Sequence, residues 1–197
     1  GGFVAKLFKA GLNAGIEINK DGYKKAGLAT RIIKGIPHKI ASALIFKKVH
    51  KIFGDNIQYC VGGGALLDIS QQKFFASIGV PVHQGYGLTE ATPIISANTP
   101  KIRKMGTSGK VLPTIECKIM DDEGNEMPLN KKGEIVIRGE NVMKGYYKNE
   151  EATNEAIKDG WLWTGDLGYM DEDGFLVVVG REKALLIAPD GEKYSPE

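Results

Sequence analysis

The strongest constraint on the fold of this chain is a segment in which two short β-prone runs flank a glycine loop and a helix signal. Residues 57–61 form the first run, which ends in three glycines at 62–64. Asp68, with Gln71 three positions later, is typical of a capping box that opens a helix. Residues 80–83 form the second β-prone run. Strand, loop, helix and strand in this order predict a βαβ unit, with two parallel strands and a covering helix.

The spacing of apolar residues differs on the two sides of this unit. Upstream, apolar residues recur at helical spacing over 3–12 and again over 37–53, where Pro37 suits a first helical turn. Downstream of about residue 94, short β-prone runs alternate with turn residues. The predicted strands are 115–120, 133–138, 161–170 and 175–180, with hairpin turns at 121–125 and 171–174. We therefore predict an α/β fold, in which a βαβ-type subdomain precedes a small β-barrel-like subdomain.

The composition excludes several classes of protein. With 42% hydrophobic and 25% charged residues, the chain matches ordinary globular domains and not disordered or fibrous ones. No apolar run approaches the roughly 18 residues that span a bilayer. Cys60 and Cys117 are too few for a disulfide scaffold, and the three histidines lack metal-ligand spacing. We expect a soluble, cytoplasmic protein with free thiols and no nucleic-acid partner.

The charges are distributed unevenly along the chain. Residues 1–110 hold 16 basic and 5 acidic side chains, a net +11, whereas residues 111–197 hold 10 and 19, a net −9. This asymmetry predicts two structural units, and a basic unit can face phosphates or an anionic membrane surface. A peripheral membrane contact is therefore one interpretation, and solvated helix faces are the other.

The most informative segment is residues 84–90, QGYGLTE, directly after the second predicted strand. Ligands of open α/β sheets bind beyond the carboxyl ends of the strands, so we expect a site in this loop. Its candidate residues are two glycines that allow close backbone approach, a tyrosine that can stack, a hydroxyl for a phosphate and a carboxylate for Mg²⁺: Gly85, Gly87, Tyr86, Thr89 and Glu90. The loop at Gly63, Gly64 and Ala65 could supply the opposite wall of a purine slot. Taken singly, either segment could be a plain turn.

Two later segments add polar groups that suit a nucleotide. In residues 161–166, Asp166 follows what the sequence predicts to be a tight turn, and Arg181 follows the last predicted strand. An aspartate can accept two hydrogen bonds from the vicinal hydroxyls of a ribose, and an arginine can support the sugar or its phosphate.

The order of these motifs resembles the adenylate-forming superfamily of acyl-CoA synthetases, over essentially the whole chain. Within it, the chain is most similar to AMP-forming long-chain fatty acid CoA ligases, because Leu88 stands between the second glycine and the threonine. The basic helical stretch at 44–49 is also similar to that branch. The motifs that carry the resemblance are 63–65, 85–90, 133–135 with 143–147, 164–166 and 180–181.

This resemblance implies a two-step reaction on three substrates: a fatty acid, ATP and CoA. The acid and ATP give an acyl-adenylate and pyrophosphate, and the CoA thiol then displaces AMP. By position, the resemblance implies adenine contacts from Gly63, Gly64, Ala65 and Tyr86, an α-phosphate contact from Thr89, a Mg²⁺ ligand in Glu90, ribose contacts from Asp166 and Arg181, and a domain hinge at Lys183.

The same resemblance implies parts that this chain does not contain. The family's phosphate loop is expected upstream of residue 1 and its catalytic lysine, in a C-terminal domain, beyond residue 197. We therefore expect residues 1–95 to be part of a second α/β subdomain, 96–180 a β-rich subdomain and 181–197 the hinge and the start of the C-terminal domain. This piece alone is then expected to be inactive. Two alternatives stay open: a non-catalytic nucleotide-binding module, and another adenylating branch such as an aryl-acid or luciferase-like ligase.

Overall fold

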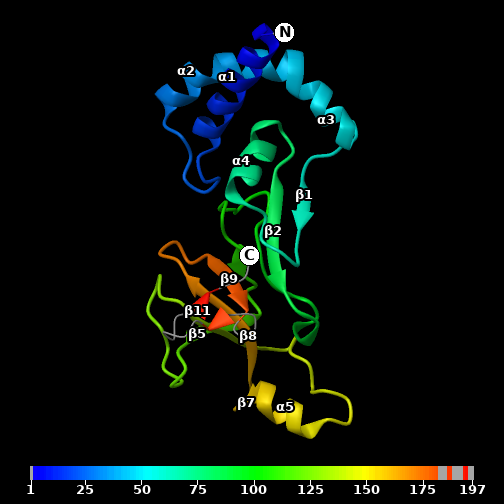
Figure 1. Ribbon diagram of the computed structural model, residues 1–197, viewed down its shortest axis with the longest axis vertical. Coiled ribbons are helices and arrows are strands. Elements are labelled where there is room, and N and C mark those ends of the chain that lie inside the picture. Colours follow the sequence, from blue (N-terminus) through cyan, green and yellow to red (C-terminus); the bar gives the residue numbers. More distant parts are fainter. Residues whose placement is uncertain (1, 182–185, 188–192, 195–197) are drawn as a thin grey trace. The chain divides into compact units, whose positions relative to one another are not determined.

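The computed structural model describes residues 2–181, 186–187 and 193–194 (Figure 1). The helical elements are α1 (Gly2–Asn19), α2 (Leu28–Ala41), the π-helical turn η1 (Ser42–Phe46), α3 (Lys47–Phe53), α4 (Ile69–Ser77), the 3₁₀ turn η2 (Thr89–Ala91) and α5 (Glu150–Ala156). The strands are β1 (Cys60–Gly62), β2 (Val82–Gly87), β3 (Ile94–Ala97), β4 (Lys110–Val111), β5 (Ile115–Met120), β6 (Gly133–Gly139), β7 (Ile157–Lys158), β8 (Trp161–Met170), β9 (Leu176–Arg181), β10 (Leu186–Ile187) and β11 (Lys193–Tyr194).

The chain forms two compact units, and each unit is made of two separate stretches of the sequence. Unit 1 comprises Gly1–Gln84 and Asn98–Gly106, and unit 2 comprises Gly85–Ala97 and Thr107–Glu197. Strand β2 therefore begins in unit 1 and ends in unit 2. The division into family subdomains at residues 95 and 180 stays a prediction.

Unit 1 contains the βαβ element. The residues of β1 pair in parallel with the first half of β2, Cys60 opposite Val82 and Gly62 opposite Gln84, and α4 connects the two strands. The Asp68 side chain caps α4 by accepting a hydrogen bond from the Ser70 backbone N–H at 2.7 Å. The predicted parallel pair, its connecting helix and the α/β fold class are confirmed.

The long helices of unit 1 depart from the sequence prediction. Helix α2 does not begin at Pro37; it begins at Leu28 and contains Pro37. Proline is disfavoured inside a helix because it lacks an N–H and crowds the preceding turn, which is why the pattern predicted a start there. Ala41 and Phe46, five residues apart, are both buried, since η1 adds a residue to the turn and brings them to one face. Among the described residues, no helix is long and apolar enough to cross a membrane.

Unit 2 is built on an antiparallel sheet with the order β5-β6-β8-β7, and β9 also pairs with β8. Asp121 and Asp171 close the two predicted hairpin turns by accepting backbone N–H groups with their carboxylates. The four predicted strands of this unit are confirmed, two of them with the predicted ends. The buried apolar side chains of this core are Ala91, Ile95, Ile115, Ile119, Ile135, Ile137, Leu162 and Leu176.

Helices α1 and α2 lie side by side in unit 1 (Figure 1), and a glycine makes their closest approach possible. A Cβ at Gly11 would overlap the Cβ of Ala41, whereas a Cβ at Gly35 would meet nothing within 4 Å. We expect Gly35→Ala to raise the free energy of unfolding by about 0.5 to 1 kcal/mol through helix propensity. Gly11→Ala gains the same propensity but overpacks the contact, so we expect a net loss of about 1 to 3 kcal/mol.

Urea unfolding of the two variants beside the parent chain checks this pair. Because both changes replace a helical glycine by alanine, their opposite signs isolate the α1–α2 contact. A stabilising Gly11→Ala would contradict the packing described here.

Candidate functional site

A bulge in β8 is the local feature around which the candidate site forms. Trp163 pairs with Val136, and Leu167 pairs with Glu134, so three residues of β8 face the single residue Ile135 of β6. The three residues are Thr164, Gly165 and Asp166. The sequence prediction that a tight turn precedes Asp166 is wrong, because β8 continues through the segment as a bulged strand.

Each bulge residue has a physical reason for its identity. The Thr164 hydroxyl donates to the Ile135 carbonyl at 2.7 Å and accepts the Asp166 backbone N–H at 3.1 Å. Gly165 has φ +69°, a conformation that glycine adopts without strain, and its N–H donates to the Glu134 carboxylate at 2.9 Å. The backbone N–H groups of Gly165 and Asp166 thus find side-chain acceptors, and the bulge re-aims the side chain of Asp166.

The carboxylate of Asp166 is the centre of the site. Its side chain is only 7% exposed. Tyr86 donates its O–H to Oδ2 at 2.7 Å, and Arg181 donates its Nε–H to Oδ1 at 2.8 Å. Arg181 stands opposite Asp166 in the β8–β9 pairing, so the strand register itself places the cation. The structure thus brings together three residues that the sequence assigned to one nucleotide.

The electrostatics of the cluster keep its donors protonated. Burial, with a further contribution from Asp166, raises the pKa of Tyr86 above its usual range, so the phenol stays a donor at any ordinary pH. The hydrogen bond and charge of Asp166 raise the pKa of Arg181. A buried carboxylate requires such partners, because an unpaired charge removed from water is strongly disfavoured.

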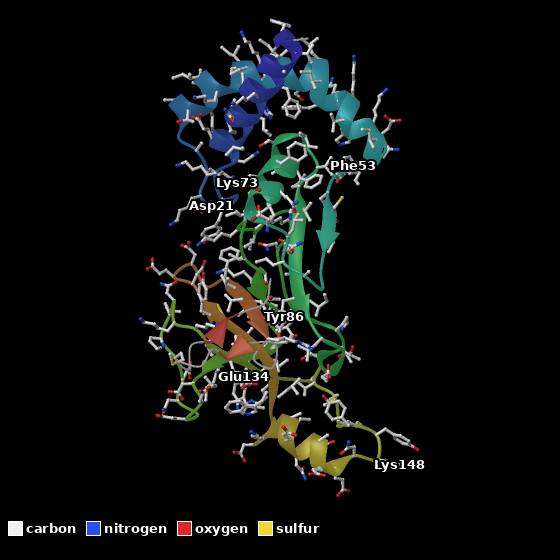
Figure 2. The ribbon with its side chains drawn as sticks, viewed as in Figure 1. Asp21, Phe53, Lys73, Tyr86, Glu134 and Lys148 are labelled. Carbon is white, nitrogen blue, oxygen red and sulfur yellow. The ribbon has the colours of Figure 1, made fainter. Side chains whose placement is uncertain are left out.

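Tyr86 lies on strand β2 (Figure 2). The prediction that residues 84–87 form a loop is wrong, because β2 extends to Gly87 and pairs with the returning strand β3. A Cβ at Gly87 would overlap the Pro93 carbonyl, and a Cβ at Gly85 would lie 3.2 Å from the Ser96 carbonyl oxygen. Both glycines therefore allow close strand pairing, and their contact with a nucleotide stays a prediction.

Thr89 and Glu90 lie in η2, the turn that follows β2. Thr89 is exposed and Glu90 is half-buried. Glu90 accepts a hydrogen bond from the Tyr146 hydroxyl on Oε1 at 3.0 Å. Burial and then Glu90 raise the pKa of Tyr146, which keeps this hydroxyl a donor.

A hollow of about 410 Å³ opens within unit 2 beside these residues. Its wall joins the η2 turn, the β8 bulge, the end of β9 and one side of α5. The lining residues are Leu88, Glu90, Tyr146, Ala152, Glu155, Ala156, Leu162, Trp163, Thr164, Gly165 and Arg181. Its wall carries two carboxylates, from Glu90 and Glu155, the guanidinium of Arg181 and two hydroxyls, so it can hold a polar ligand that both donates and accepts hydrogen bonds.

Three more of the predicted residues belong to unit 1. Gly63, Gly64 and Ala65 form a bend after β1 in unit 1, where the buried Gln84 side chain anchors the loop by accepting the Leu67 N–H at 2.9 Å. The sequence prediction did not assign Gln84 a role, although Gln84 is the first residue of the segment 84–90. Lys183 lies outside the described residues. Tyr146 was also not assigned, since nothing in its local sequence announces a partner 56 positions away.

Comparison with known proteins places the chain in a family. The family described as AMP-binding enzyme matches residues 20–147. The long-chain-fatty-acid–CoA ligase FadD15 of Mycobacterium bovis is 36% identical over 159 residues, which cover 81% of this chain and 25% of that protein. The 2-succinylbenzoate–CoA ligase of Bacillus cytotoxicus is 43% identical over 143 residues, covering 69% of this chain and 28% of that protein.

A solved structure agrees with the sequence relatives. O-succinylbenzoate coenzyme A synthetase (MenE) from Bacillus subtilis, in complex with ATP and magnesium ion, matches with a TM-score of 0.67 at 30% identity, over 88% of this chain and 38% of that one. The chain thus spans about a quarter of the length of the curated relatives, 25% and 28% for the two named above. The resemblance drawn from the motifs is confirmed: the chain belongs to the family of AMP-binding enzymes.

Proposed function

We propose that this chain is the part of an AMP-forming fatty acid CoA ligase that holds the ribose and the metal-bound phosphates of ATP. The observation that carries the proposal is the Asp166 carboxylate, buried between Tyr86 and Arg181. FadD15, a relative at 36% identity, supports the fatty acid branch.

The geometry of Asp166 suits a diol. Each carboxylate oxygen can accept about two hydrogen bonds. Oδ2 accepts one from Tyr86, and Oδ1 accepts one from Arg181. Within the described part of the chain each oxygen accepts no further hydrogen bond, so one acceptor position on each could take one of two adjacent ribose hydroxyls. The two protein donors fix the carboxylate plane in advance, so little orientational freedom is lost when the sugar binds.

Glu90 fits the role of a Mg²⁺ ligand. Its Oε1 accepts the Tyr146 hydroxyl, while Oε2 has no hydrogen bond from the described part of the chain. Within the same residues, no cluster of three or more His, Cys, Asp or Glu side chains could hold a metal. A single carboxylate such as that of Glu90 suits Mg²⁺, which proteins usually bind through one or two carboxylates together with substrate phosphates. When bound, the ion would neutralise charge on the phosphate oxygens.

The proposed reaction has two steps that share this site. A carboxylate oxygen of the acid attacks the α-phosphorus of ATP, and the bond to pyrophosphate breaks. The sulfur of CoA then attacks the acyl carbonyl, losing its proton, and AMP leaves. In both steps Asp166 and Arg181 orient the ribose, Thr89 contacts the α-phosphate, and Gly63, Gly64, Ala65 and Tyr86 flank the adenine. Lys183 is the proposed hinge for the C-terminal domain of the same chain.

A second candidate concerns the acid. The 43% identity to a 2-succinylbenzoate–CoA ligase favours a different adenylating branch with the same nucleotide chemistry. The acid, and not the nucleotide, separates these two candidates.

Carboxylate-dependent exchange between ATP and pyrophosphate in the full-length protein tests the function. We expect exchange that rises with acyl chain length and peaks with long fatty acids. Exchange that peaks with 2-succinylbenzoate or another aromatic acid would support the second candidate. A folded protein that binds ATP but exchanges with no acid would instead be a non-catalytic nucleotide-binding module.

The role of Asp166 is tested with two nucleotides. We expect Asp166→Asn to weaken ATP binding about 10- to 150-fold, because charge-assisted hydrogen bonds to the ribose are lost. Wild type should prefer ATP to 2′,3′-dideoxy-ATP, and the variant should lose this preference. Equilibrium titration of both nucleotides gives the comparison, with Asp159→Asn, an exposed turn aspartate, as the matched control. An Asp166→Asn protein that still discriminates the two nucleotides would exclude Asp166 from ribose binding.

A peripheral membrane contact is the proposal for where the enzyme meets its acid. Helix α2 exposes Ile32, Ile33 and Ile36, which are 61%, 65% and 62% exposed, beside the exposed Arg31 and Lys39. A basic helix with an apolar face complements an anionic lipid surface, and long-chain fatty acids partition into membranes.

Vesicle sedimentation of the full-length protein tests this contact. We expect binding to vesicles with anionic lipid that weakens as salt rises, and loss of binding in Ile32→Glu. Leu129→Glu, at an exposed apolar residue of unit 2, serves as the charge-matched control. Equal sedimentation with neutral vesicles, or none with either, would contradict the proposal.

A further inference from the structure

The carboxylate of Glu90 is held by residues that the proposed function does not use. Its Oε1 accepts the Tyr146 hydroxyl at 3.0 Å. Tyr146 lies in the loop between β6 and α5, two residues before Lys148, which Figure 2 labels. From this contact and those below, we infer that Tyr146, fixed by the first turn of α5, is a positioning residue that orients Glu90 toward the metal ion. The inference rests on the proposed function.

The same loop also clamps the backbone of the η2 turn. The Met143 N–H donates to the Glu90 carbonyl at 2.8 Å, and the Asn141 amide donates to the Ala91 carbonyl at 2.7 Å. In return, the Thr92 hydroxyl donates to the Asn141 carbonyl at 2.7 Å. Three hydrogen bonds therefore fix the turn on which Glu90 stands, and Tyr146 adds a fourth to its side chain.

The first turn of α5 holds Tyr146 in turn. The Tyr146 N–H donates to the Thr153 hydroxyl oxygen at 2.9 Å, and that hydroxyl donates to the Asn149 carbonyl at 2.8 Å. Asn149 is the N-cap of α5, and its side chain accepts the Ala152 N–H at 3.1 Å. Gly145 lies so close to Thr153 that a Cβ there would be 2.7 Å from its methyl carbon. The position of the tyrosine is thus set by a helix terminus and not by a free loop.

The hydrogen bond from Tyr146 restricts the orientation of the Glu90 carboxylate. A glutamate has three rotatable side-chain bonds, so an unsupported carboxylate would lose orientational freedom when it binds an ion. The Tyr146 hydroxyl donates to Oε1, and Oε2 accepts no hydrogen bond from the described residues. Groups that hydrogen-bond a metal ligand orient it and raise metal affinity in many proteins.

Tyr147 provides a matched control. It is the next residue, it is 88% exposed, and its ring meets only the Lys148 side chain among the interactions of the described chain. Tyr146→Phe and Tyr147→Phe each remove one hydroxyl and keep the ring. Thr153→Val keeps the side-chain shape and removes the acceptor of the Tyr146 N–H.

The experiment measures metal affinity directly in the full-length protein. Mn²⁺ serves as the probe, titrated by electron paramagnetic resonance with ATP present and no acid added, and ATP binding is titrated separately in EDTA. We expect Tyr146→Phe to weaken Mn²⁺ binding about tenfold, a typical effect of removing a group behind a metal ligand. ATP binding in EDTA should be unchanged. Thr153→Val should weaken Mn²⁺ in the same direction, and Tyr147→Phe should match wild type.

The outcomes separate this inference from the proposed function. Wild-type Mn²⁺ affinity in Tyr146→Phe would overturn the inference while leaving the nucleotide site in place. Equal losses of metal and metal-free ATP binding would indicate a general structural role and would also overturn it. Wild type that binds no ATP at all would overturn the proposed function, and the inference with it.

Discussion

The buried carboxylate of Asp166 imposes the arrangement of unit 2 around it. A charge that is 93% removed from solvent needs hydrogen-bond donors on its oxygens, and two other strands supply one each, Tyr86 from β2 and Arg181 from β9. The carboxylate reaches these donors only because the bulge at 164–166 re-aims it out of the regular β8 pleat. The site therefore depends on both the strand pairing and the bulge. Loss of either donor would leave the buried carboxylate with one hydrogen bond fewer.

The two carboxylates of the candidate site are supported in the same way. A tyrosine hydroxyl donates to each, Tyr86 to Asp166 and Tyr146 to Glu90. In both cases the pKa of the phenol is raised, so it serves as a donor and not as a competing charge. The supports differ in stiffness, because Tyr86 lies within a paired strand, whereas Tyr146 depends on the first turn of α5. The proposed ribose site is thus built on the sheet, and the proposed metal site on a turn that a loop and the first turn of α5 hold in place.

The sequence predicted those features that depend on local patterns. The strands at 115–120 and 161–170 follow from β-prone runs between turn residues, and the cap at Asp68 follows from one side chain. Motif order assigned Asp166 and Arg181 to the ribose of one nucleotide, but their contact with each other depends on the β8–β9 register, which local propensity does not encode. A bulge is recognised only when the residues of two paired strands are counted against each other. The sequence of 164–166 alone does not show that pairing, so it was interpreted as a turn. The start of α2 was missed because tertiary packing tolerates a proline that the isolated pattern excludes.

The proposed function depends on Asp166 binding the ribose of the nucleotide while Tyr86 and Arg181 hold the carboxylate in place. A crystal structure of the full-length protein with AMP would show this contact. We expect both ribose hydroxyls within hydrogen-bond distance of the Asp166 carboxylate, with the hydrogen bonds from Tyr86 and Arg181 still made. AMP bound with its ribose away from Asp166, or an Asp166 side chain that must leave both protein donors to reach the sugar, would contradict it.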